Sequence, residues 1–387
     1  MSKWPMVRLG DVCGFLNGGT PSKTEERYYS GTIPLITGAD IGTNEVTSAR
    51  SFITQEAVNK SATNFVEKGT VLLVSRTGVG KVAIAGMDLC FSQDITAILP
   101  EESRLDKKYL CYFLKSRASY FRYWQRGATI QGITRDVIES VEIQLFPLSS
   151  QKRVVETLDK SQEIIDGHKR QLEELDNLIK ATYYDMFGDP AKNEKGWELS
   201  CIRGLVKNAQ YGTSEKAFTQ PSEYPILRMN NITYSGEWDF SDLKYINLSE
   251  NDKAKYMVHK GELLFNRTNS KEMVGKTAAY RENYPMAFAG YLIKLTPNER
   301  SNNEFLSAFL NSEYGKLVLR SMAKCIIGMA NINAKELGSI RIYVPPIDLQ
   351  NRFAEIVIQI ENQKALVKQS IAESQNLFNS LMSRYFG

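Results

Sequence analysis

Residues 154–186, VVETLDKSQEIIDGHKRQLEELDNLIKATYYDM, decide the fold of this chain. Mostly apolar side chains recur there in alternating steps of four and three, at positions 154, 158, 161, 165, 168, 172, 175, 179, 182 and 186. A heptad pattern of this length predicts a long helix with a coiled-coil seam. Pro147 precedes the stretch, Ser149 or Ser150 can cap the helix, and Gly188 can stop it.

The pattern returns near the end of the chain, which therefore contains an internal repeat. The second seam occupies positions 353, 357, 360, 364, 367, 371, 374, 378, 381 and 385, after Pro345-Pro346 and the potential cap Asp348. Matching residues are offset by 191 (Arg76 and Arg267), 197 (Pro100 and Pro297) and 199 (Phe187 and Phe386). A solenoid repeat is far shorter, so the sequence indicates two homologous modules, each followed by its own helix.

Both modules are expected to be rich in short strands. Apolar runs follow glycine in KGTVLLVSRT (68–77) and KGELLFNRT (260–268), and helices are expected at 106–123 and 302–323. We predict an α+β fold, in which two β-rich mixed modules are joined by two long antiparallel coiled-coil helices with an internal pseudo-twofold repeat. The expected boundaries are 1–148 and 189–347 for the modules, and 149–188 and 348–387 for the helices. In the alternative arrangement, each helix packs on its own module or on another chain.

Composition narrows the class of protein. The 387 residues contain no apolar run near 18 residues and no secretory leader at the N-terminus. The five cysteines form no C-x-x-C pair and there are two histidines, so we expect a cytoplasmic chain with free thiols, without a metal site and without a membrane partner. Lys and Arg exceed Asp and Glu by 21 to 16 over residues 192–345 and by 17 to 15 over residues 1–148. This excess suits a polyanionic partner.

Catalytic motifs are not found in the sequence. Gly78-Val79-Gly80-Lys81 resembles part of a phosphate-binding loop, but Ser75 stands where a Walker A motif needs glycine. The chain has no G-x-S-x-G, no H-E-x-x-H and no Asp/Asn-Pro-Pro-Tyr run of amino-methyltransferases. We therefore predict no catalytic residue, no metal ligand and no cofactor on this chain.

Polar loops at similar places in the two copies carry side chains that suit DNA. Arginine can contact guanine bidentately, asparagine and glutamine can contact adenine, and lysine and hydroxyl groups can hold phosphates. A surface or turn role is the plainer interpretation of any one of these residues, but their repetition favours DNA contact. The candidate DNA-binding residues are Thr20, Lys23, Arg76, Thr77, Lys81, Arg126, Thr129, Gln131, Tyr211, Thr213, Lys216, Arg228, Asn230, Arg267, Thr268, Lys276, Asn331 and Asn333.

The order of these features resembles the specificity subunit of type I restriction-modification systems over essentially the whole chain. The resemblance rests on N-G-G-T-P at 17–21, G-x-I-P at 31–34, G-x-V-L-L-x-S-R-x-G-x-x-G-K at 69–81, and F-P-L at 146–148 leading into Q-K-R at 151–153. The second copy departs from the pattern at 269–273, where the glycine loop is longer.

The resemblance implies a non-catalytic subunit whose two target recognition domains read an asymmetric, bipartite site in double-stranded DNA. It also implies that the helices fix the gap between the half-sites and that two adenine methyltransferase subunits, carrying S-adenosylmethionine, dock on the chain. Some systems add two nuclease and translocase subunits that use ATP and Mg²⁺. The rival interpretation is a non-catalytic scaffold whose modules bind protein, and the salt dependence of binding distinguishes the two.

Overall fold

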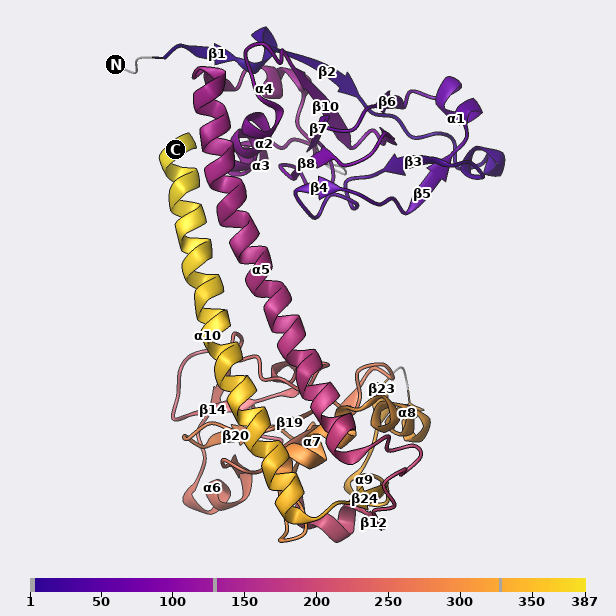
Figure 1. The fold of residues 1–387 in the computed structure, drawn as a ribbon, viewed down its shortest axis with the longest axis vertical. Helices are drawn as coiled ribbons and strands as arrows, with labels where there is room; N and C mark the ends of the chain where they lie inside the picture. The colour runs from indigo at the N-terminus through magenta and orange to yellow at the C-terminus, as the bar shows by residue number, and fades with distance from the viewer. Residues whose placement is uncertain (1–3, 128–130, 327–328) are drawn as a thin grey trace. The chain divides into compact units, whose positions relative to one another are not determined.

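The computed structural model describes residues 4–127, 131–326 and 329–387. The chain divides into two compact units (Figure 1). Unit 1 comprises the chain up to His168 together with Ser370–Gly387, and unit 2 comprises Lys169–Gln369. Each unit thus contains one β-rich module and a part of both long helices.

The long helices are α5 (Leu148–Phe187) and α10 (Ile347–Phe386). Each begins directly after a proline, one residue before the predicted start. All the predicted seam positions of both helices are buried or half-buried, so the heptad prediction is confirmed. Gly188 has a φ of +82°, a conformation that glycine adopts without strain, and it follows the last helical residue of α5 as predicted.

The two helices are antiparallel within each unit. In unit 1, Val155 and Leu158 near the start of α5 share a core with Phe386 at the end of α10. In unit 2, Phe187 at the end of α5 shares a core with Phe353 near the start of α10. Each helix therefore packs on the other helix as well as on a module, which is the predicted arrangement.

The module of unit 1 contains two sheets and a separate strand pair. One sheet has the order β2 (Cys13–Asn17), β10 (Ile95–Pro100), β7 (Val71–Val74), β8 (Val82–Ala85), β4 (Glu45–Val46). The other has the order β5 (Ser51–Ile53), β3 (Ile33–Ile36), β9 (Leu89–Phe91), β6 (Asn64–Val66). The strand pair is β1 (Met6–Arg8) with β11 (Glu142–Gln144).

The module of unit 2 repeats this topology. Its first sheet has the order β13 (Val206–Tyr211), β21 (Leu292–Pro297), β17 (Leu263–Asn266), β19 (Thr277–Ala279). Its second sheet has the order β15 (Lys244–Ile246), β14 (Tyr224–Leu227), β20 (Met286–Phe288), β16 (Met257–Val258). The pair β12 (Glu198–Cys201) with β24 (Arg341–Val344) matches β1 with β11. Unit 2 adds a small sheet of β18 (Thr268–Asn269), β23 (Met329–Asn331) and β22 (Lys324–Ile326).

The shorter helices also recur in the same order. Unit 1 has α1 (Gln55–Asn59), α2 (Lys107–Ser116), α3 (Ala118–Tyr123) and α4 (Arg135–Glu139). Unit 2 has α6 (Glu250–Tyr256), α7 (Asn303–Asn311), α8 (Glu313–Met322) and α9 (Ala334–Gly338). The two predicted helical stretches are therefore helical, but each is broken into two helices, at Arg117 and at Ser312. Ser312 starts the second helix because its side chain accepts a hydrogen bond from the Gly315 N–H at 3.0 Å.

A fully buried glutamine fastens the start of α5 to the module of unit 1. The Gln151 side chain accepts a hydrogen bond from the Asp106 N–H at 2.9 Å and donates to the carbonyls of Arg104 and Phe146, both at 2.8 Å. These bonds satisfy three backbone groups next to the helix start, so the side chain fixes how α5 leaves the module.

Gln350 forms the same three bonds in unit 2. Its side chain accepts from the Asn302 N–H at 2.9 Å and donates to the carbonyls of Arg300 and Pro345, at 3.0 and 2.8 Å. Both glutamines have 0% exposed surface. The joint between module and helix is thus the same in both copies, bond for bond.

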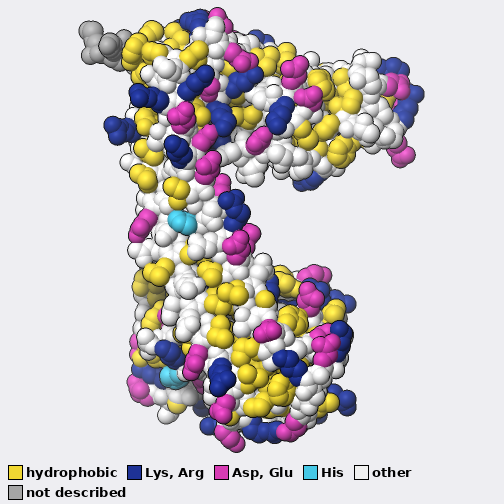
Figure 2. Space-filling model, in the orientation of Figure 1, with side chains coloured by type: hydrophobic (Ala, Val, Ile, Leu, Met, Phe, Trp, Pro, Cys, Tyr) yellow, Lys and Arg dark blue, Asp and Glu magenta, His cyan; other side chains and the backbone are white. Residues whose placement is uncertain are grey.

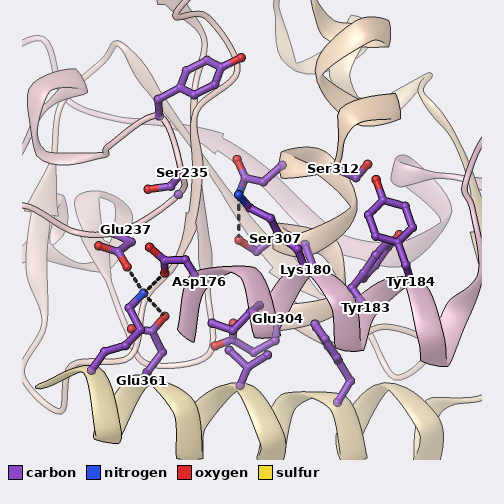
Figure 3. A pocket seen from close by; sticks show the side chains of 18 of the residues that line it. Asp176, Lys180, Tyr183, Tyr184, Ser235, Glu237, Glu304, Ser307, Ser312 and Glu361 are labelled. Atoms are coloured by element: carbon purple, nitrogen blue, oxygen red, sulfur yellow. Dashed lines mark hydrogen bonds and ion pairs between the residues drawn. The ribbon is translucent and has the colours of Figure 1, made fainter. Parts of the chain in front are cut away.

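Unit 2 also holds a buried charge beside its helices. Figure 3 shows the carboxylates of Asp176, Glu237 and Glu361 converging on one ammonium nitrogen, which belongs to Lys364. Lys364 lies on the seam of α10 and is 2% exposed; Asp176 belongs to α5 and Glu237 to a loop of the module. Burial lowers the pKa of Lys364, although the bond to Asp176 favours the charged form. The ion pairs link α5, α10 and the module of unit 2.

The described residues contain neither a membrane-spanning helix nor a cluster of metal ligands. No helix there carries an apolar stretch long enough to cross a membrane. In the same parts of the chain, no three His, Cys, Asp or Glu side chains gather in a way that could hold a metal ion.

Candidate nucleic-acid interface

The turn between β7 and β8 carries several of the predicted DNA-binding residues of unit 1. Arg76, Thr77 and Lys81 are exposed on it, and Thr77 has a φ of +48°. The turn leads from one strand into the next, whereas a phosphate-binding loop of the Walker type leads into a helix. The resemblance of residues 78–81 to such a loop is therefore superficial.

A second segment of unit 1 lies against this turn. Arg76 forms β-bridge pairing with Gly132, and Gly132 also pairs with Arg126. The Thr77 N–H donates to the Gln131 carbonyl at 3.4 Å. The structure thus brings together the backbone of two loops that the sequence places far apart, and these loops carry Arg76, Thr77, Arg126 and Gln131.

The polar loops after β2 and β13 are equivalent, and both need glycine. The N–H of Gly18 donates to the Ile95 carbonyl, and that of Gly212 to the Leu292 carbonyl, both at 3.2 Å. A Cβ at Gly18 would overlap the Ser92 carbonyl, and a Cβ at Gly212 would overlap backbone at Phe288. By this match Asn17 is the counterpart of Tyr211.

Strand pairing corrects one predicted correspondence between the copies. Val74 and Asn266 end their strands in equivalent pairs, opposite Ile95 and Leu292. The counterpart of Arg267 is therefore Ser75, and that of Arg76 is Thr268, with an offset of 192 and not 191. A shift of one residue along a strand turns a side chain to the opposite face, so the two arginines do not occupy the same place.

Arg267 is the centre of the predicted cluster in unit 2. Its guanidinium carbon lies 4.9 Å from the centre of the Tyr211 ring. One Nη2–H donates to Oδ1 of Asn331 at 3.1 Å, and the Asn331 amide donates to Oγ1 of Thr268 at 3.0 Å. Four of the predicted residues thus form one connected network.

A pocket opens beside this network. Thr213, Arg228, Asn230 and Arg267 line it together with Tyr291. Arg228 forms an ion pair with Asp242 at 2.8 Å. The Nε–H groups of Arg228 and Arg267 are buried and have no hydrogen-bond partner among the described residues. Buried donors of charged groups are rarely left unpaired.

Lys276 takes a structural position, unlike its counterpart Lys81. It is 4% exposed, and its ammonium donates to the Met229 carbonyl at 2.6 Å. Burial lowers its pKa. Nearby, burial lowers the pKa of Lys316 to about 8, and this ammonium donates to the Gly275 carbonyl at 3.2 Å. Both lysines therefore hold backbone carbonyls near the β17–β19 turn, and these bonds compensate for the burial of their ammonium groups.

The remaining candidates differ in exposure. Lys23, Lys216 and Asn230 are exposed, Thr20 and Asn333 are half-buried, and Thr213 is buried. The side chain of Asn333 accepts a hydrogen bond from the Glu336 N–H at 2.9 Å and so caps α9. Thr129 lies outside the described residues.

Tyr291 is one of several residues of the pocket that were not predicted from the sequence. Tyr291 is 52% exposed, and its carbonyl accepts from the Arg267 N–H at 3.0 Å. Its counterpart in the first copy is Asp94, one residue before the matched strand. The two copies differ at this position, with tyrosine in one and aspartate in the other. This difference is the sequence signal that could have identified Tyr291.

Charge is mixed over the visible surface of both modules. Figure 2 shows Lys and Arg side chains interspersed with Asp and Glu, without a large field of one sign on the face drawn. Charge on this face therefore does not mark an interface.

A family model described as the type I restriction modification DNA specificity domain matches residues 1–177 and 194–375. The EcoKI specificity subunit of Escherichia coli is 23% identical, over 99% of this chain and 88% of that subunit. The MjaIX specificity subunit of Methanocaldococcus jannaschii is 26% identical over 59% of this chain, and the match spans only 58% of that subunit.

Solved structures show the same fold. The crystal structure of the S subunit of a type I restriction-modification system from M. genitalium superposes with a TM-score of 0.58 at 16% identity, covering 100% of this chain and 96% of that one. At this identity the likeness establishes the fold, with its repeated modules and long helices.

Proposed function

Because the chain belongs to the type I restriction-modification DNA specificity family, we propose that it reads a bipartite DNA target and positions adenine methyltransferase subunits on it. The observation that carries the proposal is the family match to both copies of the repeat. Two homologous readers in one chain suit a target with two half-sites.

The two half-sites are proposed to differ in sequence. Five positions of the pocket and of the network beside it have other residues in the first module. In the second module they are occupied by Tyr211, Arg228, Arg267, Tyr291 and Asn331. In the same order, their counterparts in the first module are Asn17, Thr37, Ser75, Asp94 and Gly132. Bases are read by the hydrogen-bonding groups of side chains, so modules with different groups at matched positions select different bases.

The helices are proposed to set the gap between the half-sites. Each is 40 residues long, which corresponds to about 60 Å at 1.5 Å per residue. A rigid connection between two readers fixes the spacing of the sequences that they read, in the way that dimer geometry fixes half-site separation.

The proposed partners supply the chemistry. Methyltransferase subunits would bring S-adenosylmethionine and flip the target adenines out of the helix. Nuclease and translocase subunits, in systems that have them, would bring ATP and Mg²⁺. The chain itself is proposed to be non-catalytic and to act in the cytoplasm, where these partners meet DNA.

The proposal is tested by co-expressing the chain with the methyltransferase subunit encoded beside it and mapping methylated adenines across the host genome. The expected result is one split motif with two different halves and a constant gap. A stable complex that methylates no split motif would overturn the proposal, and inactivation of the methyltransferase serves as the background control.

The gap is tested by inserting one heptad into each helix. If the helices set the spacing, the gap should lengthen by up to about three base pairs, from a 10.5 Å extension and a 3.4 Å rise per base pair. Both half-sites should stay the same. An unchanged gap in an assembled, active complex would contradict this part of the proposal.

Salt dependence separates the proposal from a protein-binding scaffold. DNA affinity governed by phosphate contacts falls steeply as salt rises, because bound counterions are released. We expect the methyltransferase complex to lose on the order of 10³-fold in DNA affinity between 50 and 200 mM salt. A complex that binds DNA no better than its methyltransferase subunit alone would favour the scaffold.

A further inference from the structure

Arg267 is held in a fixed orientation at the end of β17. Its N–H donates to the Tyr291 carbonyl at 3.0 Å, and its carbonyl accepts from the Ile332 N–H at 2.9 Å. Its guanidinium lies over the Tyr211 ring, 4.9 Å from the ring centre, and donates to Asn331. Backbone and side chain are therefore both restrained.

The groups that hold Arg267 are themselves held. The Tyr211 hydroxyl accepts a hydrogen bond from the Ala334 N–H at 2.9 Å. The Asn331 carboxamide uses its oxygen for Arg267 and its nitrogen for Thr268. Asn331 was a predicted DNA contact, but these bonds occupy it, so it suits a positioning role.

The guanidinium of Arg267, which lines the pocket, keeps unused hydrogen-bond donors. Arginine has five N–H donors, and Asn331 takes one of them. The Nε–H of Arg267 is unpaired among the described residues. No ion pair found in that part of the chain involves Arg267, whereas Arg228 in the same pocket is paired with Asp242.

We propose that Arg267 reads a guanine in the half-site of the second module, with Tyr211 and Asn331 as positioning residues. A fixed guanidinium fork matches the O6 and N7 acceptors of guanine, which is the most common specific contact of arginine in the major groove. The same fork also matches a phosphate, but a phosphate contact carries no sequence information, so the methylated motif of an Arg267 variant separates the two. The inference rests on the proposed function and adds the identity of one base.

The first module lacks the whole arrangement. Ser75 replaces Arg267, Asn17 replaces Tyr211 and Gly132 replaces Asn331. Arg76, one position later, is exposed and has no ring counterpart to Tyr211. Arg267 should therefore affect only one half of the target, and the other half is an internal control.

The first experiment maps the motif methylated by the complex of each variant with its methyltransferase subunit. With R267K, preference for guanine at one position of the second half-site should fall by roughly 5- to 150-fold. The first half-site and the gap should not change. Y211A and N331A should weaken the preference at that same position, whereas Y211F, which keeps the ring but loses the bond from the Ala334 N–H, should weaken it less than Y211A does. R300K, at an exposed arginine of the second module that pairs with Glu198, is the matched control and should leave the motif unchanged.

The second experiment begins with the wild-type complex. Each guanine of the second half-site is replaced in turn by 7-deazaguanine, which lacks the N7 acceptor. Affinity should drop at a single position, and the R267K complex should not respond to that replacement.

Three results would overturn the inference. The first is a second half-site that contains no guanine. The second is an R267K complex that methylates all sites equally less, as loss of a phosphate contact would cause, and the third is an R267K complex that assembles and leaves the motif unchanged. If R267K fails to assemble, the 7-deazaguanine series decides alone. If the wild-type complex methylates no split motif, the proposed function fails first, and the two failures are distinguishable.

Discussion

Replacing Lys364 with methionine should destabilise unit 2, because it removes the buried ammonium that three carboxylates share. Methionine keeps the length of the apolar stem and fits the helix seam. The carboxylates of Asp176, Glu237 and Glu361 would then face one another without a counter-ion. Breaking a buried ion pair by removing one partner costs about 3–5 kcal/mol.

The structure places the expected loss near the lower end of that range. Lys364 is 2% exposed, but the side chains of Asp176, Glu237 and Glu361 are 33%, 22% and 21% exposed. These carboxylates can regain part of their hydration in the variant. We expect a loss of about 3 kcal/mol in the free energy of unfolding, which for a unit of roughly 200 residues lowers the Tm by about 6–12 °C.

Thermal unfolding is measured together with hydrogen exchange, since exchange at β17 and β21 reports on unit 2 and exchange at β7 and β10 reports on unit 1. Lys368 is the matched control: it is one turn further along α10, 50% exposed, and contacts Glu237 at 3.3 Å. K368M should cost less than about 1 kcal/mol, as exposed pairs do.

Two further measurements test the cause. The loss in K364M should shrink from pH 7 to pH 5, because protonation removes the mutual repulsion of carboxylates that have lost their counter-ion. The triple variant K364M/D176N/E237Q should recover most of the stability. A loss no larger than that of K368M, or a loss that grows at low pH, would refute the reasoning.

Three other substitutions give expected outcomes of different kinds. Burial lowers the pKa of Lys316 to about 8, so between pH 8 and 10 the unfolded chain binds more protons than the folded one. Denaturant unfolding of the wild type and of K316M is measured from pH 8 to pH 10. The free energy of unfolding of the wild type relative to K316M should rise by about 2–3 kcal/mol from pH 8 to pH 10, and an equal pH dependence of the two proteins would contradict the lowered pKa of Lys316. G18A forces a Cβ into the Ser92 carbonyl and should cost about 1–3 kcal/mol, while G14A, where contacts are no closer than 3.7 Å, should change denaturant stability by less than about 0.5 kcal/mol. F187A removes a ring with 0% exposure and should cost about 3–5 kcal/mol in the same assay; a loss under 1 kcal/mol would show that the site collapses around the gap.

The long helices could be predicted from sequence because their signal is local and repeats over many turns. Even Lys364, which interrupts the apolar seam, did not hide the period. The breaks at Arg117 and Ser312 were missed, since apolar side chains continue across them. Serine is nevertheless a preferred N-cap residue, because its hydroxyl can accept a hydrogen bond from the N–H two or three residues later, so Ser312 could have been recognised as the start of a helix.

The candidate interface was predicted in part, and the reason lies in distance along the chain. Loops that follow strands can be located from the alternation of apolar runs and glycines, so Arg267 and Tyr211 were named as candidates for DNA contact. That their side chains meet could not be predicted, because their contact depends on strand register, and the same holds for Arg267 and Asn331, which are 64 residues apart. The predicted match of Arg76 with Arg267 was wrong by one residue for the same reason, because only the strand register shows which residues correspond. Burial of Lys276 depends on a carbonyl 47 residues away.

The two buried glutamines, Gln151 and Gln350, make the modules interchangeable parts. A module meets its helix through two carbonyls and one N–H, and these are backbone groups that any side-chain sequence can present. Recombination that joins a foreign module at this joint would conserve its three hydrogen bonds while exchanging the loops of the candidate interface. The two long helices would keep their sequence through such an exchange.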